Sequence, residues 1–311
     1  MFKIIKLEEL PNVSNHGNLL EYTPVITDCE PIIILESWWN KIYDRLRKKI
    51  ISEFGKVIIK DFDLPRTFEP NELFWRFYNL YRYEYKIENW MHLKPDIKIV
   101  NIPKIDIESL KDLNKILICS TRNIKKRDVD EFSNKFILDI ENVLKYYSSD
   151  GAFVKLSSKS GKNHIFLHPC FNFINVLENI VGSPEILKHL DDQDVHLIFQ
   201  NWKSDICKDN EFRVIIVDKQ VRFISQQIWF SKINLQHTPE YIIEKILSYY
   251  EQNKSKIIYN DCVLDVYVTD ECNLIEINCG GHWSCAGSAL FDWHDLIRCK
   301  DNLFIYCAIT N

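Results

Sequence analysis

Acidic side chains in the middle of two apolar segments near the C-terminus are the strongest chemical signal in the sequence. Asp265 interrupts residues 263–268, and Glu276 interrupts residues 274–278, which end in Asn278. Both segments have the composition of strands and a short polar turn separates them, so we predict a β-hairpin. Residues two apart on a strand share a face. If the hairpin register sets Asp265 opposite position 276 or 278, three oxygen-bearing side chains converge.

Acids placed in apolar strands need a counter-charge. Burying a carboxylate costs roughly several kcal/mol unless it is paired or holds a cation. Hard oxygen ligands of this kind suit Mg²⁺, which also takes water and substrate phosphates. We therefore predict a magnesium site at Asp265, Glu276 and Asn278. The alternative is that the two acids pair with Lys or Arg across the sheet.

Three other segments carry weaker signals. Residues 151–163 read GAFVKLSSKSGKN, a strand with Lys155 that runs into a loop whose N–H groups could cradle phosphates. It lacks the P-loop pattern GxxxxGK[ST], and an ordinary surface turn explains it equally well. Glu211 and Arg213 share a face of a predicted strand, where the Arg could fork onto phosphate oxygens or form a surface ion pair. Residues 197–202 form a strand whose end could offer backbone groups to an adenine edge.

The surrounding elements must place these residues. Hydrophobic periodicity predicts helices at 36–54, 128–147 and 238–252, and a short helix opening at Ser183. Strands are predicted at 57–59, 115–120, 153–156 and 195–202, with hairpins at 212–226 and 262–278. Because helices and strands mix without strict alternation, the class is α+β rather than a doubly wound sheet.

Composition excludes several functional classes. The 311 residues carry a net charge of -5, which argues against nucleic-acid binding, and no apolar run approaches the roughly 20 residues of a membrane span. The ten cysteines contain no CxxC pair, so we expect free thiols in the cytoplasm. We expect a monomer.

Taken in order, the motifs resemble the cell division cycle protein 123 family over about residues 151–296, including the tail SALFDWHDL at 288–296. The resemblance implies an α+β ATP-grasp fold that holds ATP and Mg²⁺ between two subdomains. We expect an N-terminal region at 1–110, a first subdomain at 111–202 and a second at 203–311.

The resemblance also implies roles for individual residues. Lys155 would contact the α- or β-phosphate, Arg213 the triphosphate, and residues 157–162 would form a flexible phosphate lid. The implied nucleotide-binding residues are Lys155, Ser157, Ser158, Lys159, Gly161, Lys162, Gln200, Asn201, Trp202, Glu211 and Arg213, and the implied magnesium ligands are Asp265, Glu276 and Asn278. We expect Asp265→Ala to abolish magnesium-dependent ATP binding while the fold stays intact.

Members of that family bind the γ subunit of translation initiation factor 2 and promote its joining with the α subunit. The alternative is an ATP-grasp enzyme, either a ligase that works through an acyl-phosphate or a phosphoryl or nucleotidyl transferase. His282, Ser284 and Arg298 could grip a second substrate, but the sequence identifies no catalytic residue.

The chain departs from the family pattern in three places. Glu276 stands where the family has Asp, Cys279-Gly280-Gly281 stands where it has Pro, and Gln200 and Asn201 replace a charged pair. We expect the glycines to loosen the loop beside the metal.

Overall fold

The computed structural model describes residues 47–48, 50–52, 84–120, 123–147, 149–157, 168–183, 189–190, 195–207, 209–227 and 234–280, and the backbone of four further short strands. The chain divides into two compact units. Unit 1 comprises Met1–Tyr85 and Ile206–Asn311, and unit 2 comprises Lys86–Asp205. The sequence placed boundaries after residues 110 and 202.

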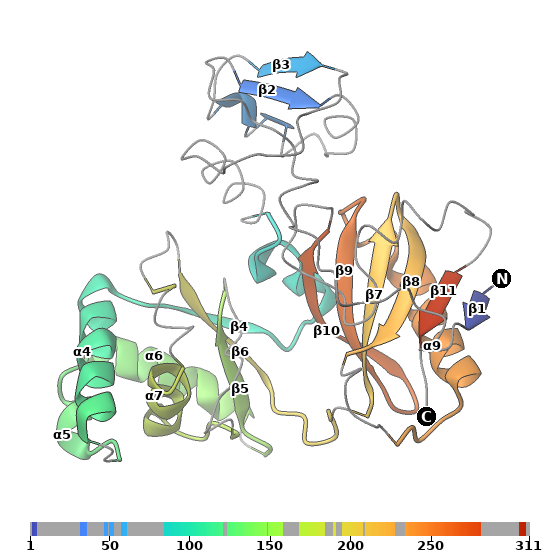
Figure 1. Ribbon diagram of the computed structural model, residues 1–311. Coiled ribbons are helices and arrows are strands. Elements are labelled where there is room, and N and C mark those ends of the chain that lie inside the picture. The colour runs from blue at the N-terminus through green and yellow to red at the C-terminus, as the bar shows by residue number, and fades with distance from the viewer. Residues whose placement is uncertain are drawn as a thin grey trace. The chain divides into compact units, whose positions relative to one another are not determined.

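Unit 1 is built on a six-stranded mixed sheet in the order β1-β11-β8-β7-β9-β10 (Figure 1). Its central strands pair antiparallel, whereas β11 adds to β8 in parallel and β1 adds to β11 in parallel. A separate parallel pair joins β2 and β3. The strands are β1 (Phe2–Ile4), β2 (Ile32–Leu35), β3 (Val57–Lys60), β7 (Glu211–Val217), β8 (Gln220–Gln226), β9 (Cys262–Val268), β10 (Cys272–Cys279) and β11 (Ile305–Ala308).

The two predicted hairpins of this sheet form as expected. The β7–β8 turn uses Asp218 and Lys219 at positive φ angles of 49° and 61°, the combination that a type I′ hairpin turn requires. Helix α9 (Pro239–Asn253) begins after Thr238, whose side chain accepts a hydrogen bond from the Tyr241 N–H, and it packs against β9 and β10. The sequence therefore predicted the strands that carry the acids.

A pair of tyrosines fixes the segment that enters β9. The Tyr85 hydroxyl donates to the Asp261 carbonyl at 2.7 Å, and the Tyr259 hydroxyl donates to the Glu84 carbonyl at 2.9 Å. The two rings stack with centroids 4.2 Å apart. These reciprocal contacts attach residues 84–85 to the start of β9.

Unit 2 has a three-stranded antiparallel sheet, β4-β6-β5, with helices on one side (Figure 1). Alternate strand residues, including Val154, Leu156, Leu197 and Phe199, join the helices in one hydrophobic core. The elements are two 3₁₀ turns at Ile87–Asn89 and Met91–Leu93, β4 (Lys98–Asn101), α4 (Lys104–Ser120), α5 (Lys126–Val129), α6 (Asn134–Leu144), a 3₁₀ turn at Lys145–Tyr147, β5 (Ala152–Leu156), α7 (Phe173–Val181) and β6 (His196–Asn201).

Two sequence predictions in unit 2 were wrong. Residues 115–120, predicted as a strand, are the last turns of α4, because the buried or part-buried positions 107, 110, 113 and 117 follow a helical period. The helix predicted at 128–147 is divided into α5 and α6. Asp106 accepts hydrogen bonds from both the backbone N–H and the hydroxyl of Ser133, at 2.7 Å each, and Ser133 caps α6.

Within the described parts of the chain, no helix is both long and apolar enough to cross a bilayer.

Candidate functional site

One face of the unit 1 sheet carries a row of charged side chains across three adjacent strands. Arg213 of β7 lies opposite Asp265 of β9, and Asp265 lies opposite Glu276 of β10. Directly opposite residues share a face, as do residues two apart on a strand. Glu211 and Asn278 therefore extend the same row. The register question left open by the sequence is resolved, since Asp265 pairs with position 276.

A β-bulge on β10 produces this register. Leu274 lies opposite Val266, so an unbroken ladder would set Ile275 opposite Asp265. The register instead shifts between Leu274 and Glu276, which brings Glu276 to Asp265. A bulge inserts one extra residue and re-aims the side chains that follow it. The acid on β10 reaches the charged face because of this irregularity.

Arg213 and Asp265 form a buried two-pronged ion pair. The guanidinium donates from Nε to Oδ1 at 2.7 Å and from Nη2 to Oδ2 at 2.8 Å. Arg213 is 8% exposed and Asp265 is 7% exposed. Paired N–H···O bonds of this kind are strong and directional. The alternative considered from the sequence, an acid paired with a cation across the sheet, thus describes Asp265.

Asn278 joins the two acids of the row. Its Nδ2 donates to Asp265 Oδ2 at 2.9 Å and to Glu276 Oε1 at 3.2 Å. Two carboxylates and an amide therefore lie within hydrogen-bonding reach of one another, and their oxygens are of the kind that Mg²⁺ prefers. Among the described residues, no group of three or more His, Cys, Asp and Glu side chains is placed to hold a metal. A magnesium site here would therefore need the side-chain amide of Asn278 as a ligand beside the carboxylates.

The row has more negative than positive charge, and this shifts its pKa values. Burial raises the pKa of Glu211 to about 7, and the carboxylates of Asp265 and Glu276 add to the rise, although Arg213 opposes it. Burial also raises the pKa of Asp265, where Arg213 again opposes the rise and Glu276 adds to it. Burial lowers the pKa of Arg213, but the surrounding carboxylates outweigh this and raise it. A bound cation would relieve the repulsion among the acids.

A second set of predicted residues lies on one sheet face of unit 2. Lys155 and Gln200 are each 6% exposed, and Ser157 is 9% exposed. Lys155 lies opposite Ile198, and Gln200 lies opposite Phe153. By strand alternation these side chains occupy the face that the helices leave uncovered. The Ser157 hydroxyl accepts a hydrogen bond from the His196 N–H at 3.2 Å.

Two backbone N–H groups at the end of β6 already donate hydrogen bonds within unit 2. The Asn201 N–H donates to Asp96 Oδ2 at 3.3 Å, and the Trp202 N–H donates to the Gly151 carbonyl at 3.1 Å. Both side chains are half-buried. These two N–H groups therefore already have partners within unit 2. Contact between the backbone of this segment and an adenine edge stays a prediction.

Comparisons with known proteins bear on the chain as a whole. The family model D123 matches residues 135–304, which is more than half of the chain. The chain belongs to the D123 family. Residues 135–304 contain Lys155, Gln200 and the whole charged row of unit 1. No curated protein matches the chain in sequence.

Solved structures show the fold. The chain resembles Cdc123 from Schizosaccharomyces pombe at 17% identity and TM-score 0.57, over 74% of this chain and 96% of that chain. A C-terminally truncated form of that protein matches at 17% identity and TM-score 0.56, over 74% of this chain and 97% of that chain. The predicted α+β fold is confirmed by these two structures. D-alanine–D-alanine ligase from Bacillus anthracis complexed with ATP matches at 10% identity and TM-score 0.32, over 62% of this chain and 54% of that chain.

Several predicted residues of this D123 protein lie outside the described residues. They are Ser158, Lys159, Gly161 and Lys162 of the expected phosphate lid, His282, Ser284 and Arg298 of the expected second-substrate site, and the tail at 288–296.

The glycine after the charged strand is held tightly. A Cβ atom on Gly280 would lie 2.4 Å from the Asp261 carbonyl carbon and 2.5 Å from the Cys262 nitrogen. Only glycine permits this approach of two backbones. Gly280 therefore serves close packing beside the site, where the sequence had indicated a loosened loop.

Two residues near the candidate sites gave no signal in the sequence. Lys94 contacts Gln200 and Asp96 contacts Asn201, yet both come from an irregular segment about a hundred residues earlier. Contacts between distant segments of this kind leave no periodic pattern.

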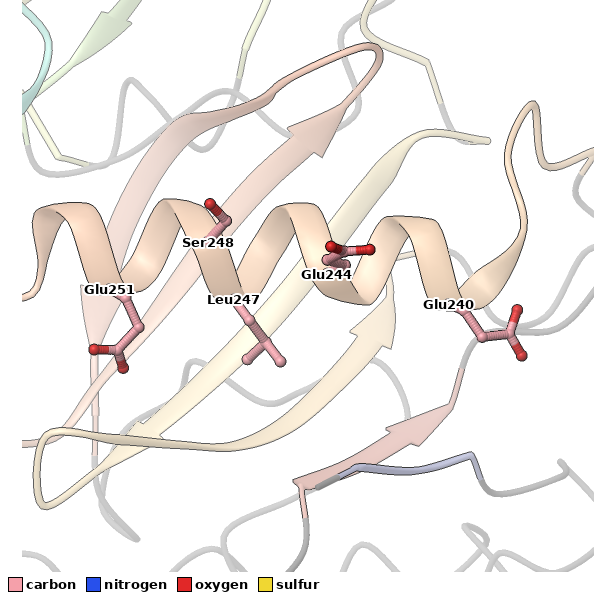
Figure 2. A pocket seen from close by; sticks show the side chains of 5 residues that line it. All are labelled: Glu240, Glu244, Leu247, Ser248 and Glu251. Carbon is pink, nitrogen blue, oxygen red and sulfur yellow. The ribbon is translucent and has the colours of Figure 1, made fainter.

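A shallow depression along α9 is a poor candidate for a phosphate site. Figure 2 shows the side chains that line it, Glu240, Glu244, Leu247, Ser248 and Glu251. Three of the five are acids and none is a cation, so anionic ligands would be repelled.

Proposed function

We propose that this D123 protein binds ATP together with Mg²⁺ and uses the complex to assemble translation initiation factor 2. The observation that carries the proposal is the charged row of unit 1. Among the described residues of this row, the carboxylates of Glu211, Asp265 and Glu276 share one sheet face with the guanidinium of Arg213, and Asp265 and Arg213 are buried. An excess of acid at such a place favours a bound cation.

Glu276 and Asn278 would hold the metal, with Asp265 as the third ligand. Asn278 now points Nδ2 at the carboxylates. Only its Oδ1 can ligate a cation, so the amide would turn over when Mg²⁺ binds. The bound ion would supply charge neutralisation for the nucleotide phosphates. Arg213, already oriented by Asp265, would add a positive charge beside them.

The unit 2 residues support the nucleotide part of the proposal. Lys155 is a buried cation on a sheet face next to an apolar floor, Ile198, which is 0% exposed. We assign Lys155 and Ser157 to the phosphates and the region of Gln200, Asn201 and Trp202 to the base.

Membership of the D123 family, together with the resemblance to cell division cycle protein 123, leads to the proposed role. The protein would bind the γ subunit of translation initiation factor 2 in the cytoplasm and promote its joining with the α subunit. Family membership is the reason that we favour an assembly factor over an ATP-grasp enzyme.

The test is an assembly assay with purified factor subunits from the same host. We expect the γ subunit to co-purify with the protein, and joining of α to γ to be faster with protein and Mg-ATP than without them. Glu276→Gln should reduce the ATP-dependent increase in the rate at which α joins γ. Conversion of labelled ATP to ADP or AMP with a covalently modified product would instead establish an enzyme, and failure to bind the γ subunit would refute the assembly role.

A further inference from the structure

The side-chain amide of Gln200 has a fixed orientation. Its Oε1 accepts a hydrogen bond from Lys94 Nζ at 2.6 Å. An ammonium group can only donate, so the oxygen must face Lys94 and the nitrogen must point away. Gln200 Nε2 is buried and has no hydrogen-bond partner among the residues that the structure describes. Leaving a buried donor unpaired is unfavourable, so such groups are uncommon.

The surroundings of this donor fit a flat ring. Phe153 lies directly opposite Gln200 on the same face, and the next position along β6 on that face is the buried Ile198. Lys155 lies opposite Ile198, one step further from Gln200. An aromatic and an aliphatic side chain beside a polar donor form a surface on which a base can stack. The order along the strand would set the base near Gln200 and the phosphates near Lys155.

Resting on the proposed ATP binding, we infer that Gln200 Nε2 donates a hydrogen bond to a ring nitrogen of the adenine base and that Lys94 positions the amide to do so. Lys94 is a positioning residue because it acts through Gln200. It lies before residues 135–304, the part of the chain that the family model matches. Without Lys94 the amide can turn over and present its oxygen, an acceptor, to the ring nitrogen.

The experiment compares ligands with and without a base. Affinities of the full chain for ATP and for inorganic tripolyphosphate, both with Mg²⁺, are measured by calorimetry or competition. Lys94→Met and Gln200→Leu should weaken ATP binding roughly 3- to 10-fold, the effect of about one hydrogen bond, and leave tripolyphosphate unchanged. Lys94→Arg should retain most of the affinity for ATP.

Lys98→Met is the matched control for loss of a nearby lysine. Lys98 lies opposite Phe199, on the face that packs against the helices, and its Nζ lies 4.4 Å from the centre of the Tyr146 ring. Its replacement should leave the affinity for ATP unchanged. Circular dichroism of every variant checks folding. If Lys94→Met does not fold, the affinities of Gln200→Leu decide the test.

The 1-deaza, 3-deaza and 7-deaza analogues of ATP identify the acceptor. Wild-type protein should bind one of them more weakly than ATP, and Gln200→Leu should remove that preference, as a double-mutant cycle requires. The inference is overturned if wild type binds all three analogues as tightly as ATP, or if tripolyphosphate and ATP weaken equally in the variants. Absence of ATP binding in wild type would refute the proposed function itself, and the inference with it.

Discussion

Removal of the Asp265 carboxylate should destabilise unit 1 as well as affect ligand binding. Both oxygens of Asp265 are bonded to the buried guanidinium of Arg213, at 2.7 and 2.8 Å. Truncation of one partner of a buried ion pair leaves an uncompensated charge and typically costs about 3–5 kcal/mol. Glu211 and Glu276 remain beside Arg213 and offset part of that charge. We therefore expect the lower end of the range, about 3 kcal/mol, for Asp265→Ala.

Urea unfolding followed by circular dichroism measures this loss. With a slope of about 2 kcal/mol per molar urea, the midpoint should fall by about 1.5 M. The double variant Arg213→Met/Asp265→Leu should recover most of the stability, because apolar replacement of both partners leaves no buried charge. A loss below about 1 kcal/mol for Asp265→Ala, as for an exposed pair, would refute the reasoning. The sequence predicted that Asp265→Ala leaves the fold intact, whereas the buried ion pair leads us to expect a loss of stability.

Two other substitutions test the packing and charge of the same sheet. The folded-state pKa of Glu211, about 7, lies above its usual value, so the folded state binds more protons between roughly pH 4.5 and 7 and its stability falls as pH rises through that window. In the wild type this decline in folding stability should reach up to roughly 3 kcal/mol, and Glu211→Gln should lack it when thermal unfolding is measured with a chelator. If the stability of the variant depended on pH as that of the wild type does, the raised pKa would not belong to Glu211. Gly280→Ala should lower the unfolding midpoint by the equivalent of about 1–3 kcal/mol, since its Cβ would lie 2.4 Å from the Asp261 carbonyl carbon, and an unchanged midpoint would show that the two backbones separate freely.

The sequence could predict the hairpins because their signals are local. Apolar residues on either side of a short polar turn define β7 and β8, and the acids at 265 and 276 stand out within apolar strands. Sequence spacing alone also placed Glu276 and Asn278 on one face. The site residues of unit 1 were therefore accessible to reasoning from period-two alternation.

The register and the helix boundaries were not accessible in the same way. Ordinary alternation places Leu274 on the face of Glu276, and only the bulge separates them. The start of α6 depends on Asp106, a residue of another helix, which accepts two hydrogen bonds from Ser133. Such features arise from tertiary contacts that override local preference.

The roles of Arg213 and Gln200 illustrate the same division. The sequence offered Arg213 as a phosphate ligand or a surface ion pair, whereas the structure places it in a buried pair with Asp265. For Gln200, the sequence pointed to backbone groups at the strand end. The contact that orients its side chain comes from Lys94, 106 residues away, and no local pattern connects the two.

Magnesium dependence of ATP binding is the most direct test of the central claim, that the row on β7, β9 and β10 holds a cation carrying nucleotide phosphates. Calorimetric titration of ATP into the full chain would be run with Mg²⁺ and with a chelator, for wild type, Glu276→Gln and the exposed control Glu271→Gln. We predict one ATP bound per chain, weakened at least tenfold by the chelator, with that dependence largely lost in Glu276→Gln and kept in Glu271→Gln. Equal affinity with and without Mg²⁺, or a Glu276→Gln variant that behaves as wild type, would contradict the claim.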